Sequence, residues 1–238
     1  CKWSDGELRN KSTGRKVTAI MAVHLLGHPV DMKPILEVAQ RYGLSVIEDA
    51  TESLGAKYDG GNVGSFGDVA CFSFNGNKLI TTGGGGMIVT DNQEYADKAR
   101  YLSTQAKDDP VEYVHNEIGY NYRLTNIQAA MGCAQMELIE EYVEAKRSIA
   151  ARYSEALKSV PGLTTMNQAT WAESVFWMYT VLIDESSYGI DSRALLESLA
   201  ERRVQTRPLW QPGHQSPAHA STISADYPVA DRISRDAL

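Results

Sequence analysis

The stretch VTAIMAVHLLGHPVDMKPILEVAQRYGLSVIED (residues 17–49) decides the fold class. Residues 17–24 are an apolar run of strand length, and residues 45–49 are a second, β-branched run of the same kind. Between the two runs, apolar residues repeat at helical spacing, and Gly43 follows as a residue that ends helices. A strand, a helix and a strand in this order predict two parallel strands joined by a right-handed crossover.

The same alternation continues along the chain. Further strands are predicted over residues 69–74 and 87–90, and helices over residues 93–102, 125–136 and 137–157. Strands that alternate with helices predict an α/β fold with a mainly parallel sheet flanked by helices.

Beyond Pro161 the sequence pattern changes. The elements predicted there are a strand over residues 175–183, a helix over 192–201 and a strand over 204–207. We therefore expect a large domain over residues 1–160 and a smaller α+β domain over residues 161–238.

Composition excludes several classes of protein. The 238 residues are 43% hydrophobic and 22% charged, which is typical of a globular chain. A net charge of −7 argues against a nucleic-acid or anionic-membrane partner, since both need a basic face. No apolar run reaches the roughly 20 residues that a membrane helix needs. We expect a cytoplasmic protein, although a chain that begins at Cys1 leaves open whether a leader precedes it.

The three cysteines, Cys1, Cys71 and Cys133, are widely spaced and include no CxxC pair. This disfavours a disulfide framework and a zinc site, so no metal is expected. Cys71 and Cys133 are predicted to be small buried hydrophobes.

Three polar residues follow predicted strands. Asp49 ends the strand over 45–49, at the edge where open parallel sheets bind ligands, although a helix-capping or solvated acid is the plainer interpretation. Ser73 alternates with two phenylalanines before a glycine-rich turn, a setting that suits a phosphate oxygen. Lys78 lies in that turn, where an amine beside a cofactor can form a Schiff base, whereas most lysines in turns are surface residues.

The glycine run Gly83–Gly86 needs a backbone reason such as positive φ or a close approach. It matches neither GxxxxGK[ST] nor GxGxxG, so nucleotide hydrolysis and dinucleotide binding are poorly supported. A carboxylate, a hydroxyl and an amine on successive strand ends are instead the groups that pyridoxal phosphate requires.

The sequence resembles the DegT/StrS family of pyridoxal-phosphate-dependent nucleotide-sugar aminotransferases. The stretches that carry the resemblance are VIEDA (46–50), GSFGD (64–68), FSFNGNK (72–78), GYNYRL (119–124) and QAA (128–130). The resemblance implies an aspartate-aminotransferase-like fold (fold type I), a pyridoxal 5'-phosphate cofactor and homodimers with active sites at the subunit interface. Family members are longer, so the chain resembles a fragment lacking both ends, including the N-terminal phosphate-binding turn and the aromatic that stacks on the cofactor.

The resemblance also assigns roles to residues. Lys78 matches the Schiff-base lysine, Asp49 the partner of the pyridine nitrogen and Ser73 the phosphate-binding serine. Asn121 matches the residue that reaches the phosphate from the neighbouring subunit, and Arg123 is expected to line the same shared site on the substrate side.

Other matches are less specific. Glu52 stands where many members carry glutamine near the cofactor's 3-hydroxyl. His24 ends the first strand, where the family also has histidine; it is a candidate for substrate binding, with a core or capping histidine as the alternative. Trp210 and His214 lie where the family often approaches its substrate. The aromatics Trp171, Phe176, Trp177 and Tyr179 are interpreted as core residues.

Lys78 also favours one activity. A branch of the family has histidine there and dehydrates or deoxygenates sugars, so the lysine favours transamination. We expect transfer of an amino group from glutamate to the C4 ketone of a nucleotide-linked 4-keto-6-deoxy sugar. Local similarity around residues 75–87 indicates a UDP-linked N-acetylhexosamine of the bacillosamine or legionaminic-acid type. The alternatives are a sugar dehydratase of the same family and a non-catalytic regulator that binds the cofactor or the nucleotide sugar.

Overall fold

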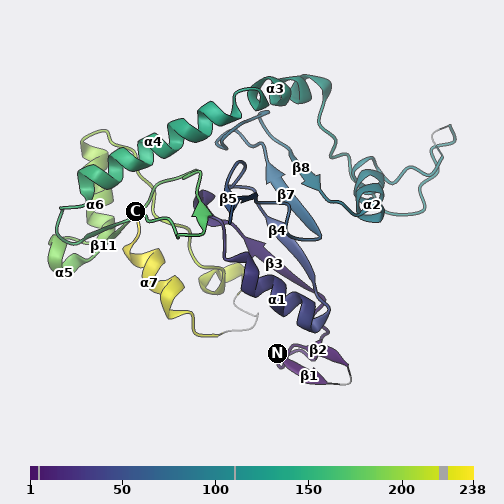
Figure 1. The fold of residues 1–238 in the computed structure, drawn as a ribbon, viewed down its shortest axis with the longest axis horizontal. Helices are drawn as coiled ribbons and strands as arrows, with labels where there is room; N and C mark the ends of the chain where they lie inside the picture. Colours follow the sequence, from purple (N-terminus) through teal and green to yellow (C-terminus); the bar gives the residue numbers. More distant parts are fainter. Residues whose placement is uncertain (5, 110, 220–224) are drawn as a thin grey trace. The chain divides into compact units, whose positions relative to one another are not determined.

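The computed structural model describes residues 1–4, 6–109, 111–219 and 225–238. It contains two compact units (Figure 1). Unit 1 consists of Cys1–Arg147 and Gln168–Met178, and unit 2 of Ser148–Asn167 and Tyr179–Leu238. This division differs from the boundary at residue 160 expected from the sequence, because the chain enters unit 2 at Ser148 and returns to unit 1 for Gln168–Met178.

The main sheet of unit 1 has the strand order β3-β4-β7-β8. These strands are Ala19–Val23, Ser45–Asp49, Val69–Ser73 and Gly86–Val89. The first three are parallel, whereas β8 pairs antiparallel with β7 at the edge (Figure 1). Val23, Asp49 and Cys71 are in register, so the carboxyl ends of the parallel strands meet at one edge. The predicted α/β class with a mainly parallel sheet is confirmed.

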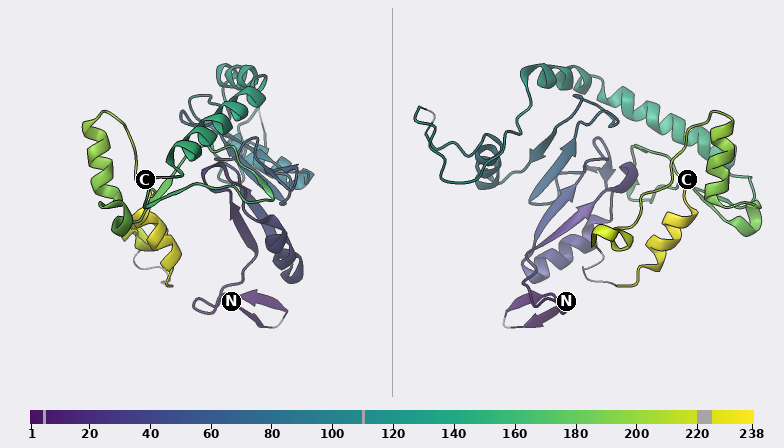
Figure 2. Two further views of the ribbon diagram at one scale, coloured as in Figure 1. Left: turned by 60° about the vertical axis from the view of Figure 1, so that its left-hand side comes forward. Right: turned by 180° about the vertical axis from the view of Figure 1, so that it is seen from behind.

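The crossover between β3 and β4 is helix α1 (Met32–Tyr42), which runs alongside β3 in both figures (Figures 1 and 2). Met32 and Ala39 are its buried residues, and they pack in one cluster with Ala22 and Val46 of the sheet. Gly43 ends the helix at φ 62°, a left-handed conformation that glycine adopts without a steric penalty.

Three longer helices follow the sheet: α2 (Gln93–Ser103), α3 (Asn126–Met136) and α4 (Ile139–Leu157). Side-chain caps fix the first two starts: Asn92 accepts from two backbone amides of α2, and Thr125 and Gln128 form a capping box on α3. All three agree with the predicted helices to within about two residues.

Short strands complete unit 1. The antiparallel pair β1 (Lys2–Ser4) and β2 (Glu7–Arg9) lies near the N-terminus. A second small sheet has the order β10-β5-β6, formed by Ala172–Glu173, Lys57–Tyr58 and Gly61–Asn62. Through β10, a segment that is distant in sequence joins the fold of unit 1.

Unit 2 pairs β9 (Leu163–Thr165) with β11 (Val181–Ile183) in antiparallel fashion. The helices of unit 2 include α5 (Glu185–Tyr188), α6 (Ser192–Glu201) and α7 (Pro228–Asp236). Single-turn helices occur at Gly213–Gln215 and Pro217–His219 in unit 2, and at Leu25–Gly27 in unit 1. The predicted helix over 192–201 is confirmed.

Of two predicted strands in the C-terminal region, the one over residues 175–183 was wrong in extent and the one over residues 204–207 was wrong altogether. Of residues 175–183 only the last three form a strand, because Phe176 adopts a positive φ of 45° and breaks the extended run. Residues 204–207 are not a strand: the amide of Val204 donates to the Leu199 carbonyl at the end of α6, and Arg203 has φ 61°.

Candidate active site

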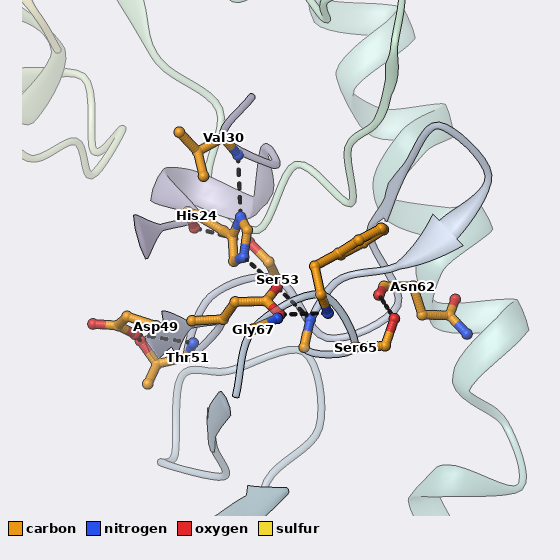
Figure 3. A network of polar contacts seen from close by, with 11 residues as sticks. His24, Val30, Asp49, Thr51, Ser53, Asn62, Ser65 and Gly67 are labelled. Atoms are coloured by element: carbon orange, nitrogen blue, oxygen red, sulfur yellow. Dashed lines mark hydrogen bonds and ion pairs between the residues drawn. The ribbon is translucent and has the colours of Figure 1, made fainter. Parts of the chain in front are cut away.

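Asp49 and Ser73 lie at the carboxyl ends of adjacent parallel strands, as predicted. The Oδ1 atom of Asp49 accepts hydrogen bonds from the amide (3.2 Å) and the hydroxyl (2.7 Å) of Thr51. Its Oδ2 atom has no hydrogen-bond partner among the described residues, and the side chain points away from the polar cluster around His24 (Figure 3). Asp49 therefore has one carboxylate oxygen available for a ligand.

Ser73 is half-buried on β7. Its Oγ accepts from the amide of Asn75 at 3.3 Å, which leaves the hydroxyl proton available for donation. The turn that follows is closed by the amide of Lys78, which donates to the Asn75 carbonyl at 3.0 Å. Ser73 and Lys78 are thus joined by one short turn at the carboxyl end of β7.

The Lys78 amine lies between a carboxylate and an aromatic ring. Its Nζ is 3.7 Å from Oε1 of Glu52 and 3.9 Å from the ring centroid of Trp177. The side chains of Lys78 and Glu52 are only 13% and 14% exposed, so water screens their attraction less than at the surface. Lys78 is therefore not the surface lysine that most turns carry.

Two backbone contacts fix these partners. The other carboxylate oxygen of Glu52, Oε2, accepts from the amide of Leu26 at 2.7 Å. The indole Nε1 of Trp177 donates to the carbonyl of Asn77, directly before Lys78, at 2.7 Å. Sequence reasoning interpreted Trp177 only as a core aromatic; it is buried, but its ring also covers the amine. No local signal marks this role, since the hydrogen bond that fixes the indole joins Trp177 to Asn77, 100 positions away in the sequence.

His24 is a core histidine, not a substrate-facing one. It is completely buried, and its Nδ1 accepts from the amide of Val30 at 3.1 Å. The proton is therefore assigned to Nε2, which donates to Oε2 of Glu48 at 3.0 Å. With both ring nitrogens bonded inside the protein, the interpretation of His24 as a substrate ligand is corrected in favour of the core alternative.

Glu48 is the acceptor at the centre of this buried network. Its oxygens accept from the amides of Gly64 (2.7 Å), Phe66 (2.7 Å) and Gly67 (2.6 Å), in addition to His24. Burial opposes ionisation, but the hydrogen bonds from His24 and the three amides outweigh it and hold the pKa of Glu48 below its ordinary value. An ionised Glu48 thus ties strand β4 to the loop that precedes β7.

The structure does not bring Asn121 and Arg123 to these residues. Both are exposed, and Asn121 forms an isolated bridge with Thr104. The neighbouring rings of Tyr120 and Tyr122 stack at 5.0 Å. Within the described ranges, neither predicted residue has a hydrogen bond or ion pair to the lysine turn.

The remaining candidate residues differ in burial and in contacts. In unit 2, Nε2 of His214 lies 2.6 Å from Oδ1 of Asp231, and Trp210 is exposed. Cys71 is half-buried, and burial raises the pKa of its thiol. Cys133 is exposed, so its prediction as a buried residue was wrong: none of the residues of α3 is buried.

Comparison with known proteins identifies the family. The model of the DegT/DnrJ/EryC1/StrS aminotransferase family matches residues 6–238. The chain belongs to this family. A GDP-perosamine synthase of Caulobacter vibrioides is 42% identical over 224 residues, covering 94% of this chain and 60% of the relative. A GDP-perosamine synthase of Escherichia coli O157:H7 is 38% identical over 230 residues, covering 97% and 61%.

The family also accounts for the fold. The crystal structure of the aminotransferase TlmJ from Streptoalloteichus hindustanus superposes with a TM-score of 0.86 at 27% identity, covering 95% of this chain and 61% of that chain. The predicted aspartate-aminotransferase-like fold is confirmed. The chain thus spans about three fifths of the length of the relatives that it matches, as its interpretation as a fragment anticipates.

The residues at the sheet edge fit the family's cofactor, pyridoxal 5'-phosphate. A protonated pyridine nitrogen needs an anionic acceptor, and Asp49 Oδ2 is available for it. A phosphate oxygen needs donors such as the Ser73 hydroxyl, and an imine needs a primary amine, which Lys78 supplies. Among the described residues, no group of three or more His, Cys, Asp or Glu side chains is placed to hold a metal ion, and no helix is long and apolar enough to cross a membrane.

Proposed function

We propose that the full-length protein transfers an amino group from glutamate to the C4 ketone of a nucleotide-linked 4-keto-6-deoxy sugar, with pyridoxal 5'-phosphate as cofactor. The observation that carries the proposal is the Lys78 amine, shielded between Glu52 and Trp177 and one turn beyond the strand end that bears Ser73. Relatives named as GDP-perosamine synthases support a nucleotide-sugar substrate. A cytoplasmic location is part of the proposal.

Each residue has a distinct task in this reaction. The cofactor supplies an electron sink when it is bound. Asp49 accepts a hydrogen bond from the ring nitrogen and keeps that nitrogen protonated, and Ser73 donates to a phosphate oxygen. Lys78 Nζ, as a free amine, takes the proton from Cα of glutamate in the first half-reaction and places a proton on C4 of the sugar in the second.

The nucleotide is the less constrained part of the proposal. The residues around 75–87 favour a UDP-linked N-acetylhexosamine by local similarity. A GDP-linked sugar is the second candidate, because the relatives from Caulobacter vibrioides and Escherichia coli are named for GDP-perosamine. Trials with the UDP-linked and the GDP-linked 4-keto-6-deoxy sugars at equal concentration distinguish the two by their kcat/KM.

We further propose a homodimer whose active sites are shared. Asn121 and Arg123 are exposed polar residues, and large apolar side chains close to them in sequence are exposed as well. Ile118 is 83% exposed, Tyr122 74% and Ile127 77%. Large apolar side chains at such exposure suit burial against another protein surface, and the polar residues among them suit a partner's phosphate site.

The test uses the full-length gene product loaded with pyridoxal phosphate. We expect a yellow protein, and borohydride reduction followed by peptide mapping should place the adduct on Lys78. Lys78→Ala should lose both the adduct and the turnover, measured as 2-oxoglutarate formed from glutamate plus ketosugar. An adduct on another lysine, or near-normal transamination by Lys78→Ala, would refute the assignment. A dehydratase or a regulator would form no net 2-oxoglutarate.

A further inference from the structure

The face of the Trp177 indole lies over the Lys78 amine, with Nζ 3.9 Å from the ring centroid. An ammonium group over the face of tryptophan is attracted by the ring's electrons, and the attraction is stronger where water is excluded. Trp177 is only 4% exposed, so the contact is largely desolvated. The ring therefore favours one position of the amine among the many that a lysine side chain can sample.

The ring is held in register with Lys78 by its own hydrogen bond. The indole Nε1 donates to the carbonyl of Asn77 at 2.7 Å, so the indole is fixed to the residue that precedes the lysine. The backbone of Trp177 is held as well, because Nζ of Lys146 donates to its carbonyl at 2.9 Å. Core packing alone does not require the indole N–H to be directed at the lysine turn.

One loop supports both partners of the amine. The carbonyl of Gly27 accepts from the amide of Val175 (3.0 Å) and from the hydroxyl of Ser174 (2.9 Å), which anchors the segment that carries Trp177. The preceding residue, Leu26, donates its amide to Glu52. Gly27 itself packs so closely that a Cβ there would lie 2.7 Å from the backbone nitrogen of Trp177.

Two residues next to these contacts, Leu26 and Phe176, have a strained backbone. Leu26 has φ 57° and Phe176 has φ 45°, a left-handed conformation that is unfavourable for large side chains. The strained Leu26 points its amide at Glu52, and the strained Phe176 directly precedes Trp177. Strained residues persist where the surrounding contacts determine them, and they gather at functional sites.

We propose that Trp177 is a positioning residue for the Lys78 amine, and that Trp177 and Glu52 form a clamp supported by the loop 25–27. The inference rests on the proposed function, in which Lys78 must act as a free amine between two carbon atoms. Each time the amine has taken a proton it is an ammonium group, which Trp177 and Glu52 attract and hold in place. Loss of the clamp therefore slows the proton transfers more than it weakens substrate binding.

The first test measures geometry in the cofactor-free full-length protein. With [6-¹³C]lysine, the ε-CH₂ resonance of Lys78, assigned with Lys78→Arg, should be shifted upfield by the indole ring. Trp177→Leu should abolish the upfield shift, and Trp177→Phe should retain part of it. The matched control is Trp171→Leu, which removes an indole that packs on His28 and Tyr58 and should leave the Lys78 resonance in place.

The second test measures the proton transfer in the loaded enzyme. Trp177→Leu should lower kcat of the glutamate half-reaction about tenfold, equivalent to about 1.4 kcal/mol, with KM for glutamate within about twofold. The primary isotope effect with [2-²H]glutamate should rise in Trp177→Leu and stay unchanged in Trp171→Leu.

A Lys78 resonance that is identical in the parent and in Trp177→Leu would overturn the clamp. An equal loss of kcat in both tryptophan variants, with no change in isotope effect, would do the same, because it would indicate packing alone. If the parent forms no 2-oxoglutarate, the proposed function fails instead, and the resonance of Lys78 still decides the clamp.

Discussion

Glu48→Gln tests whether the buried carboxylate of Glu48 on β4 is ionised and needed for the stability of the fold. Glu48 is completely buried and receives four donors: the His24 ring and the amides of Gly64, Phe66 and Gly67. Glutamine has the same shape but carries an NH₂ group in place of one acceptor oxygen. Each oxygen of Glu48 accepts from two of these donors, so the NH₂ group of glutamine faces two N–H donors in either orientation of the amide. His24 cannot instead accept from this NH₂ group through Nε2, because its Nδ1 already accepts from the amide of Val30 and the ring proton therefore stays on Nε2.

The expected loss of stability follows from this donor count. Two hydrogen bonds to a charged acceptor are lost, and two donors stay buried without a partner. Breaking one side of a buried, charge-assisted network costs about 3–5 kcal/mol. We therefore expect the free energy of unfolding of the cofactor-free protein to fall by about that amount, while the same replacement at the exposed Glu173 changes it by less than about 0.5 kcal/mol.

The pH dependence of this loss has a definite sign. Because the folded-state pKa of Glu48 lies below its ordinary value of 4.5, its stabilisation is fully present above pH 4.5 and is lost as the pH falls through the folded-state pKa. The difference in the free energy of unfolding between the parent and Glu48→Gln should therefore become smaller below pH 4.5. Urea unfolding at pH 7 and at several pH values below 4.5 measures this difference. A difference under about 1 kcal/mol at pH 7, or one that increases in acid, would refute the reasoning.

Three further changes test other parts of the site. Asp49→Asn should retain bound cofactor by absorbance but lower kcat about a hundredfold or more, because a neutral amide does not keep the ring nitrogen protonated; activity within a few-fold of the parent counts against its role. Mixing inactive Lys78→Ala with inactive Asn121→Ala should restore about a quarter of the parent activity, because half of the randomly formed dimers are mixed and each mixed dimer has one of its two sites intact. No recovery argues against active sites shared between subunits. Gly27→Ala should destabilise unit 1 by more than about 2 kcal/mol, because at φ 90° the new Cβ would lie 2.7 Å from a backbone nitrogen. The control Gly213→Ala, with open space around the residue, should change stability by less than about 0.5 kcal/mol, and equal stabilities of the two variants in urea contradict the predicted clash.

The sequence determined the elements whose pattern is local. The β3-α1-β4 unit follows from one apolar run, one helical pattern and a glycine stop, all within residues 17–49. Asp49, Ser73 and Lys78 were recognisable as candidate site residues because each stands at or just after a predicted strand end. The topology of a parallel sheet then places the two strand ends at one edge, without any knowledge of distant contacts.

Only the tertiary structure decided what surrounds these residues. The periodicity of residues 175–183 suggested a strand, but the Ser174 hydroxyl and the Val175 amide instead bind Gly27, so the chain turns at Phe176 and brings Trp177 to the lysine. An apolar pattern predicts that a face is buried, but only the folded chain decides which side chains are covered. His24 is a core residue bound to Glu48, whereas Cys133 on the apolar helix α3 is exposed. Contacts between segments 100 residues apart depend on the folded backbone, and no local spacing encodes them.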